Sequence, residues 1–171
     1  MKKYFDSFIK KIAPYQQYLW LLIFLQALAG TLGSLYYSTF GDPVLDLQNG
    51  TLFGGPGGFT PCELCWYARV LLYPITLISL IGILNKDQKF VNYVLALSLP
   101  GILLELYHYS IQMLPGAKYT ICSPENPCTN IEVSYFGFIT IPFLSLIAFI
   151  VISLCAYLSR EITKYWKEKA V

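Results

Sequence analysis

The chain has 171 residues, enough for one ordinary domain, and 56% of them are hydrophobic and 16% aromatic. Only 13% are charged, against roughly 25% in an average soluble domain. This composition disfavours a soluble fold. The formal net charge is a small +2, and the Lys and Arg residues form no stripe with interleaved aromatics. We therefore expect no nucleic-acid partner.

Four apolar runs follow a basic start, residues 1–15, which we expect to lie at the membrane surface. Each run is near the ~20 residues that a membrane-spanning helix needs. The runs cover residues 17–38, 62–84, 90–114 and 135–158. Between them lie loops 39–61 and 115–134 and a tight polar connection at 85–89. The sequence therefore predicts an all-α integral membrane protein, a single domain built as a bundle of four transmembrane helices.

The cationic residues are divided unevenly between the two sides of this bundle. Four spans place both termini on one side. The N-terminal segment, the 85–89 connection and the C-terminal tail hold ten of the twelve Lys and Arg residues. Such segments stay in the cytoplasm. We therefore expect cytoplasmic termini, and loops 39–61 and 115–134 on the outer side.

This topology sorts the five cysteines. Cys62 and Cys65, here called the helix pair, start the second span. Cys122 and Cys128, the loop pair, lie in the second outer loop, where nothing in the sequence buries them. Cys155, in the fourth span, suits a small buried hydrophobe. Proximity favours a disulfide within each pair, although four cysteines allow three connectivities.

A Cys-x-x-Cys pair can close and reopen a disulfide, which is the basis of thiol–disulfide exchange. The same spacing also occurs in structural staples and in zinc sites. Disulfides persist on the outer side of a membrane, so a zinc site is disfavoured there and we expect no metal. The loop pair could pass electrons to the helix pair, or could be a simple loop clip.

Two ionisable side chains lie in the apolar spans near the helix pair. Arg69 follows Cys65 by four residues and shares its helical face, where a cation and a helix N-terminus both favour a thiolate. His108 lies about 9 Å before the outer end of its span, at ~1.5 Å per residue, in one stripe with Glu105 and Gln112. Such a layer would suit a flat, lipophilic molecule with polar edges. Simpler readings are an Arg69 that snorkels to the headgroups and a Glu105–His108 lock between helices.

The pattern Pro-Cys-x-x-Cys-x-Tyr-x-Arg at residues 61–69, the four spans and the loop pair resemble the DsbB family of disulfide bond formation proteins. The chain is nearer to the short BdbC-type members of Gram-positive bacteria. The resemblance covers nearly the whole chain. It differs at Ala68, where some members carry an acidic residue, and in the short spacing of the loop pair.

This resemblance implies a thiol:quinone oxidoreductase in a bacterial plasma membrane. The loop pair would reoxidise an extracytoplasmic thioredoxin-like dithiol protein. The helix pair would pass the electrons to a membrane quinone, menaquinone or ubiquinone, with Cys65 adjacent to the quinone and Arg69 contacting it. The product, an oxidised partner, would sustain disulfide formation in exported proteins. From its depth we expect His108 to belong to the quinone site as well.

Three alternatives differ in what they demand of the cysteines. An enzyme of the vitamin K epoxide reductase type also relays electrons between thiols and a quinone. In that family, however, the quinone-proximal Cys-x-x-Cys lies late in the bundle, whereas here it comes first. A disulfide-stapled membrane scaffold would need no redox turnover. A carrier that exports reductant would need cysteines within reach of the cytoplasm, where Cys155 has no partner.

Overall fold

The computed structural model describes residues 2–42, 58–114, 122–123 and 125–169. Its helices are α1 (Lys2–Ile12), the 3₁₀ turn η1 (Ala13–Tyr15), α2 (Gln16–Phe40), α4 (Glu63–Leu84), α5 (Phe90–Met113) and α6 (Ile141–Lys169). In these residues the only β-type pairing is an isolated bridge between Tyr135 and Ile139. Most of loop 39–61, which we predicted to lie on the outer side, falls outside the described residues.

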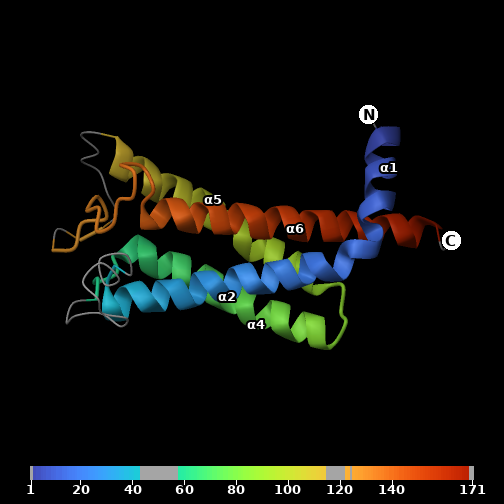
Figure 1. Cartoon of the computed structure of the whole chain (residues 1–171), viewed down its shortest axis with the longest axis horizontal. Coiled ribbons are helices and arrows are strands. Elements are labelled where there is room, and N and C mark those ends of the chain that lie inside the picture. Colours follow the sequence, from blue (N-terminus) through green and yellow to red (C-terminus); the bar gives the residue numbers. More distant parts are fainter. Residues whose placement is uncertain (1, 43–57, 115–121, 124, 170–171) are drawn as a thin grey trace.

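Four helices are long and apolar enough to cross a membrane, and they contain α2, α4, α5 and α6. These helices run antiparallel along one axis, as Figure 1 shows. Each packs against its neighbours in the order α2, α4, α5, α6, and α6 returns to α2. The predicted all-α fold with a four-helix membrane bundle is confirmed.

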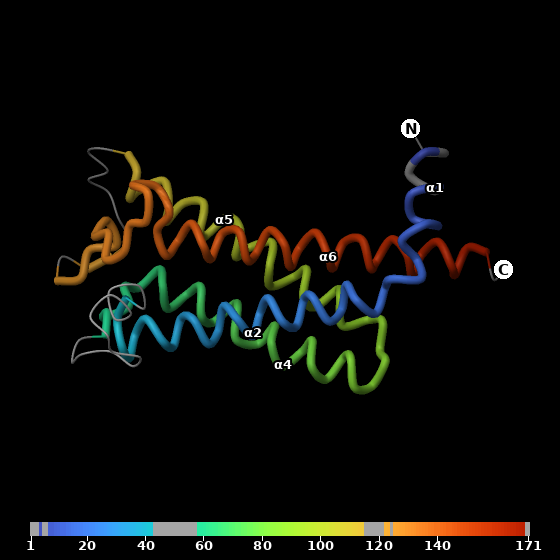
Figure 2. Tube along the Cα trace, in the orientation of Figure 1, coloured from blue at the N-terminus to red at the C-terminus, as the bar shows by residue number. Residues whose placement is uncertain are grey.

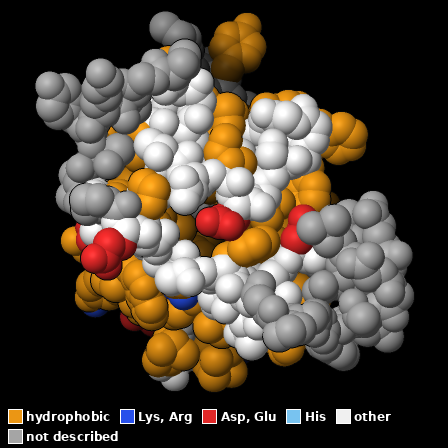
Figure 3. Space-filling view, turned by 90° about the vertical axis from the view of Figure 1, so that its left-hand side faces the viewer, with side chains coloured by type: hydrophobic (Ala, Val, Ile, Leu, Met, Phe, Trp, Pro, Cys, Tyr) orange, Lys and Arg blue, Asp and Glu red, His pale blue; other side chains and the backbone are white. Residues whose placement is uncertain are grey.

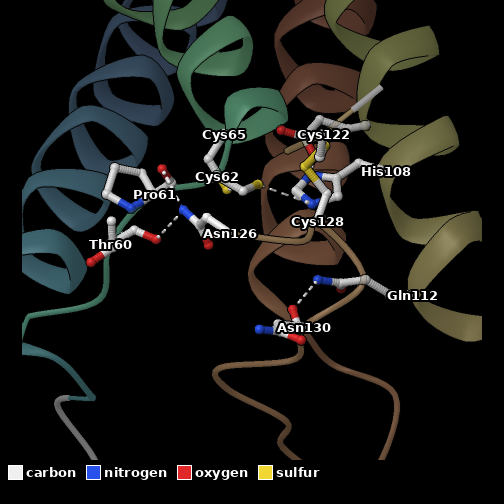
Figure 4. Close-up of a disulfide and its surroundings, with 11 residues drawn as sticks. Thr60, Pro61, Cys62, Cys65, His108, Gln112, Cys122, Asn126, Cys128 and Asn130 are labelled. Carbon is white, nitrogen blue, oxygen red and sulfur yellow. Dashed lines mark hydrogen bonds and ion pairs between the residues drawn. A yellow bond between two sulfur atoms is a disulfide. The ribbon is translucent and has the colours of Figure 1, made fainter. Parts of the chain in front are cut away.

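The two ends of the bundle differ in what they carry. Both termini lie at one end, here called the terminal end (Figure 2). The other end gathers the last turns of α2 and α5 and the first turns of α4 and α6. It also holds the helix pair and the loop pair (Figure 4), and is called the cysteine end. The topology therefore brings all four of these cysteines to one place.

Packing inside the bundle is closest where glycine faces an aromatic ring. Lipid is as apolar as the core, so helices in a membrane associate through close packing rather than through exclusion of water. A Cβ atom on Gly101 of α5 would lie 2.5 Å from Phe149 Cε1 of α6, and one on Gly82 of α4 would lie 2.3 Å from Phe90 Cγ. Only glycine leaves room for these rings.

Hydrogen bonds close the bundle between α2 and α6 near the terminal end. The indole Nε1 of Trp20 donates to Ser159 Oγ at 2.6 Å, and Gln16 Nε2 donates to Thr163 Oγ1 at 2.9 Å. Trp20 also meets the ring of Phe90 edge-on, with centroids 5.4 Å apart. These contacts join the first and last long helices of the chain.

The fourth helix differs from the apolar run 135–158 that suggested it. α6 starts only at Ile141, because Tyr135 and Ile139 exchange backbone hydrogen bonds of 2.9 and 3.0 Å around a tight turn. Phe136 and Gly137 in that turn have φ of 54° and 82°, a left-handed conformation that cannot continue a right-handed helix. The apolar run includes this turn, but the helix begins only after it.

At its other end α6 continues to Lys169, beyond the apolar run. α1 crosses the bundle there at a steep angle (Figure 1), a direction that fits a segment lying along a membrane surface. Ile9 and Ala13 pack with Ile162 of α6. Ile9 is 2% exposed and Ile162 fully buried. Part of the apolar face of the N-terminal segment is thus covered by α6, while Tyr4 and Phe8 remain exposed.

Candidate functional site

The helix pair stands at the first turn of α4. Cys62 is the N-cap, with extended φ and ψ of −69° and 172°, and its carbonyl accepts a hydrogen bond from the Trp66 N–H at 3.1 Å. Both thiols are free. Cys62 Sγ lies 3.1 Å from Cys65 Sγ, within hydrogen-bond distance, so the two sulfurs are close enough to exchange between thiols and a disulfide after a small movement.

His108 of α5 approaches the helix pair from the opposite wall, as Figure 4 shows. Its Nε2 lies 3.7 Å from Cys62 Sγ, and its Nδ1 lies 3.5 Å from Glu105 Oε2. His108 and Glu105 are 1% and 2% exposed. Glu105 and His108 therefore face inward from α5. Together with Cys62 they place a carboxylate, an imidazole and a sulfur next to one another.

The Cys62 thiol has a pKa below the usual range of a thiol. The donated hydrogen bond from Cys65 makes the largest contribution, and the nearby ring of His108 acts in the same direction. Burial opposes them by disfavouring the charged form. Cys62 is therefore the sulfur of the helix pair on which the site stabilises a negative charge.

Cys122 and Cys128 form a disulfide that lies directly against the helix pair. Cys128 is 1% exposed and packs in one cluster with Cys62, Leu64 and Ile111, whereas Cys122 is half-buried. The expectation that nothing buries this pair was wrong. The loop folds back over the end of the bundle, and this return depends on contacts between residues distant in sequence.

Two side-chain amides hold the loop in that position. Asn126 Nδ2 donates to the carbonyl oxygens of Pro61 and Thr60 at 3.3 and 3.4 Å, just before the helix pair. Gln112 Nε2 of α5 donates to the carbonyl of Asn130 at 2.9 Å. Sequence reasoning missed the role of Asn126. Its position between the loop-pair cysteines was the only available signal.

Arg69 is turned toward α2. Its Nε donates to Ser34 Oγ at 2.8 Å, and a terminal nitrogen donates to the Ser34 carbonyl at 3.0 Å. The guanidinium carbon also lies 5.1 Å from the ring centroid of Trp66. The half-buried Arg69 is therefore held by protein groups on two sides. No pattern in the sequence marks Ser34 as the partner of Arg69.

A cavity of about 490 Å³ opens between the helices at the cysteine end, within the range of about 300–1,000 Å³ typical of small-molecule sites. Its lining is mostly apolar and comes from α2, α4, α5 and α6. Cys62, Cys65, Arg69, Glu105 and His108 all line it. Figure 3 views this end, where acidic side chains lie among hydrophobic and neutral ones. The structure thus brings the predicted site residues, with the loop disulfide, to one cavity.

Comparison with known proteins identifies the family. The model for disulfide bond formation protein DsbB matches residues 50–159, more than half of the chain. The SPbeta prophage-derived disulfide bond formation protein B of Bacillus subtilis is 40% identical over 139 residues, 81% of this chain and 82% of that protein. No solved structure matches.

Two further relatives carry similar names. The probable disulfide formation protein C of Halalkalibacterium halodurans is 41% identical over 78% of this chain and 87% of its own length. The disulfide bond formation protein C of Bacillus subtilis is 40% identical over 74% of this chain and 80% of its own. With its four membrane helices and its clustered cysteines, this chain belongs to the DsbB family of membrane disulfide-forming oxidoreductases.

Proposed function

We propose that this protein reoxidises a thioredoxin-like dithiol protein outside the cytoplasm and passes the two electrons to a membrane quinone. The observation that carries the proposal is the packing of both cysteine pairs in one buried cluster at the mouth of the cavity. The oxidised partner would then form disulfides in exported proteins.

The proposed topology follows from charge. The terminal end carries the basic start and tail of the chain, and cationic segments remain in the cytoplasm. The cysteine end then faces outward, where a disulfide can persist. We assign the protein to a bacterial plasma membrane with both termini cytoplasmic.

Electrons enter at Cys122. A thiolate of the reduced partner attacks its half-exposed sulfur, because Cys128 is 1% exposed and out of reach. The S–S bond breaks and Cys128 leaves as a thiolate. The second thiol of the partner then displaces Cys122 from the mixed disulfide. The partner leaves as a disulfide, and the loop pair holds two electrons and two protons.

Transfer to the helix pair repeats this exchange. A loop-pair thiolate attacks the Cys62–Cys65 disulfide, and a second displacement restores the Cys122–Cys128 bond. The helix pair is left as two thiols. The contact between the loop disulfide and the two free thiols at the start of α4 supports an exchange between these pairs.

Reoxidation of the helix pair releases two electrons and two protons. His108 Nε2, 3.7 Å from Cys62 Sγ, takes the proton of Cys62, and Glu105 stabilises the resulting imidazolium. The Cys62–Cys65 bond forms between sulfurs that lie 3.1 Å apart, the Cys65 proton is released as well, and both protons and both electrons would leave with the reduced quinone. A bound quinone supplies the two-electron oxidant.

The lining of the cavity fits a quinone. It is largely apolar, and it includes the buried polar atoms Gln112 Oε1 and Thr140 Oγ1, which have no hydrogen-bond partner in the described part of the chain. A carbonyl oxygen of a flat ring could accept a hydrogen bond from the Thr140 hydroxyl, whereas Gln112 Oε1, itself an acceptor, would suit a hydroxyl group of the reduced ring. Arg69 and His108 would hold its polar edges, with Cys65 adjacent to the ring.

The test mixes the purified protein with a reduced thioredoxin-like protein and a soluble quinone and follows the quinone absorbance. Turnover is expected in the wild type and is lost in Cys65→Ser. Cys155→Ser is the matched control, since this lone thiol of α6 lies outside the cavity lining. Reduction that persists undiminished in Cys65→Ser would refute the proposal. A scaffold would show neither turnover nor a trapped mixed disulfide.

A further inference from the structure

Three metal-binding atoms converge beside the cavity. The sulfurs of Cys62 and Cys65 and a ring nitrogen of His108 all lie within 4.8 Å of one another. Two come from the first turn of α4 and the third from α5, and Figure 4 shows the three side chains pointing together. None of them is exposed. The proposed exchange places His108 beside Cys62, but it does not require the imidazole nitrogen to lie near Cys65 Sγ as well.

The distances suit a tetrahedral ion. Zinc binds sulfur at about 2.3 Å and imidazole nitrogen at about 2.0–2.1 Å, which places two tetrahedral sulfurs about 3.8 Å apart and a sulfur and a nitrogen about 3.6 Å apart. The observed separations are 3.1 Å between the sulfurs and 3.7 Å between Cys62 Sγ and His108 Nε2. Opening the sulfurs by less than an ångström would admit the ion.

A carboxylate supports the third ligand. Metal-binding histidines commonly donate their second ring N–H to a carboxylate, which fixes the tautomer and the ring orientation. Glu105 Oε2 lies 3.5 Å from Nδ1 of His108, leaving Nε2 directed at Cys62. Glu105 and His108 also line the cavity, so the fourth position of the ion faces space that water can fill.

We propose that the reduced helix pair and His108 form a three-ligand site for a thiophilic divalent cation, for which Zn²⁺ is the best match. Binding replaces the protons of both thiols, so that one ion enters and two protons leave. Both sulfurs are then held by the ion and cannot re-form a disulfide. The site exists only in the reduced state, since a disulfide offers no thiolates.

Metal binding requires only the side chains of Cys62, Cys65 and His108, whichever molecule accepts the electrons. Its consequence for turnover does rest on the proposed function: Zn²⁺ would trap electrons in the helix pair and inhibit quinone reduction. A metal chelator would reverse that inhibition. Metal binding and turnover are therefore measured separately.

The binding experiment uses the full chain in detergent, with Co²⁺ as a spectroscopic probe and Zn²⁺ as its competitor. Reduced protein is expected to take up one Co²⁺ with a thiolate-to-cobalt charge-transfer band, which Zn²⁺ abolishes. Oxidised protein should show no such band. Loss of an outer-shell partner commonly costs about 10–100-fold in affinity, so we expect Glu105→Gln to lose that much and His108→Ala or Cys65→Ser at least as much.

Cys155→Ser is the matched control and should bind Co²⁺ as the wild type does. Circular dichroism shows whether each variant is folded. Any cobalt that Cys65→Ser retains belongs to other thiols. Equal binding by oxidised and reduced protein, or by Cys65→Ser and the wild type, would overturn the site. Cobalt binding without quinone reduction would leave the site standing and remove the proposed function.

Discussion

Helices α2 and α6 are joined by direct hydrogen bonds at the terminal end of the bundle, but a cavity lies between the helices at the cysteine end. At the terminal end, Trp20 and Gln16 of α2 bond directly to Ser159 and Thr163 of α6. Toward the cysteine end, both helices contribute to the walls of the cavity. One end joins the first and last long helices of the chain, and the other holds them around a space.

Unpaired polar atoms mark the same difference. A buried polar group without a partner costs about 1–3 kcal/mol. Gln112 Oε1 and Thr140 Oγ1 are buried without a hydrogen bond in the described residues, whereas Glu105 Oε2 and His108 Nδ1 have each other at 3.5 Å as an ion pair, and all four residues line the cavity. Hydrogen bonds that stabilise the bundle thus join α2 and α6 at the terminal end, whereas the reactive groups lie at the cysteine end, where the helices surround the cavity.

The largest expected effect comes from adding one methyl group at each end. In Gly82→Ala the new Cβ would lie 2.3 Å from Phe90 Cγ, whereas in Gly33→Ala it meets no described atom within 4 Å. Overpacking commonly costs about 1–3 kcal/mol. We expect Gly82→Ala to lose about 2–3 kcal/mol, and Gly33→Ala to be neutral or slightly stabilising. Unfolding in mixed detergent micelles measures both, and equal losses would contradict the contrast between the ends.

The next effect concerns the charge at the helix pair. Since the pKa of Cys62 is lowered, its sulfur remains a thiolate when the pH falls below the usual thiol range. His108→Ala removes one stabilising partner, so the pKa should rise by about 1–2 units, as expected for a hydrogen bond to a charged group. Ultraviolet absorbance of the thiolate against pH, with Cys62→Ser as blank, gives the midpoint. Gln112→Ala, on the same face of α5, should leave it unchanged, and an unmoved midpoint in His108→Ala would exclude this role.

The smallest effect tests how Arg69 is positioned. Ser34→Ala removes the hydrogen bond that Arg69 Nε donates to the Ser34 hydroxyl, while the bond that Arg69 donates to the Ser34 backbone carbonyl remains. A hydrogen bond to a charged group contributes about 1.5–3 kcal/mol, and part of this is retained. We expect KM for quinone to rise about fivefold to tenfold with kcat changed less. Ser34→Thr should restore KM, and a KM unaffected by Ser34→Ala would show that Arg69 is positioned by other contacts.

Much of this architecture could be predicted from the sequence. Apolar runs of spanning length predicted four helices, because a membrane imposes that length. The spacing of Glu105, His108 and Gln112 predicted one face of α5, and the structure places all three on the cavity. Local periodicity was sufficient in each case.

Other features depend on contacts between distant segments. Ser34 holds Arg69 across 35 positions of sequence, and Asn126 reaches the carbonyl of Pro61 across 65. No local pattern marks such a contact. The burial of Cys128 follows from the same return of the loop. The late start of α6 reflects a left-handed turn at Gly137, which the hydrophobic run conceals.

The length of α6 has a mechanical consequence. Its 29 residues extend about 43 Å at ~1.5 Å per residue, well beyond the ~30 Å hydrocarbon core of a bilayer. α1 crosses this projecting part, anchored by Ile9 against Ile162, and carries Lys10 and Lys11 in its last turn. A charged helix that lies across the end of α6 resists entering the hydrocarbon core of the bilayer. α1 would therefore limit how deeply the bundle sinks into the bilayer, and so keep the cysteine pairs at the opposite surface of the membrane.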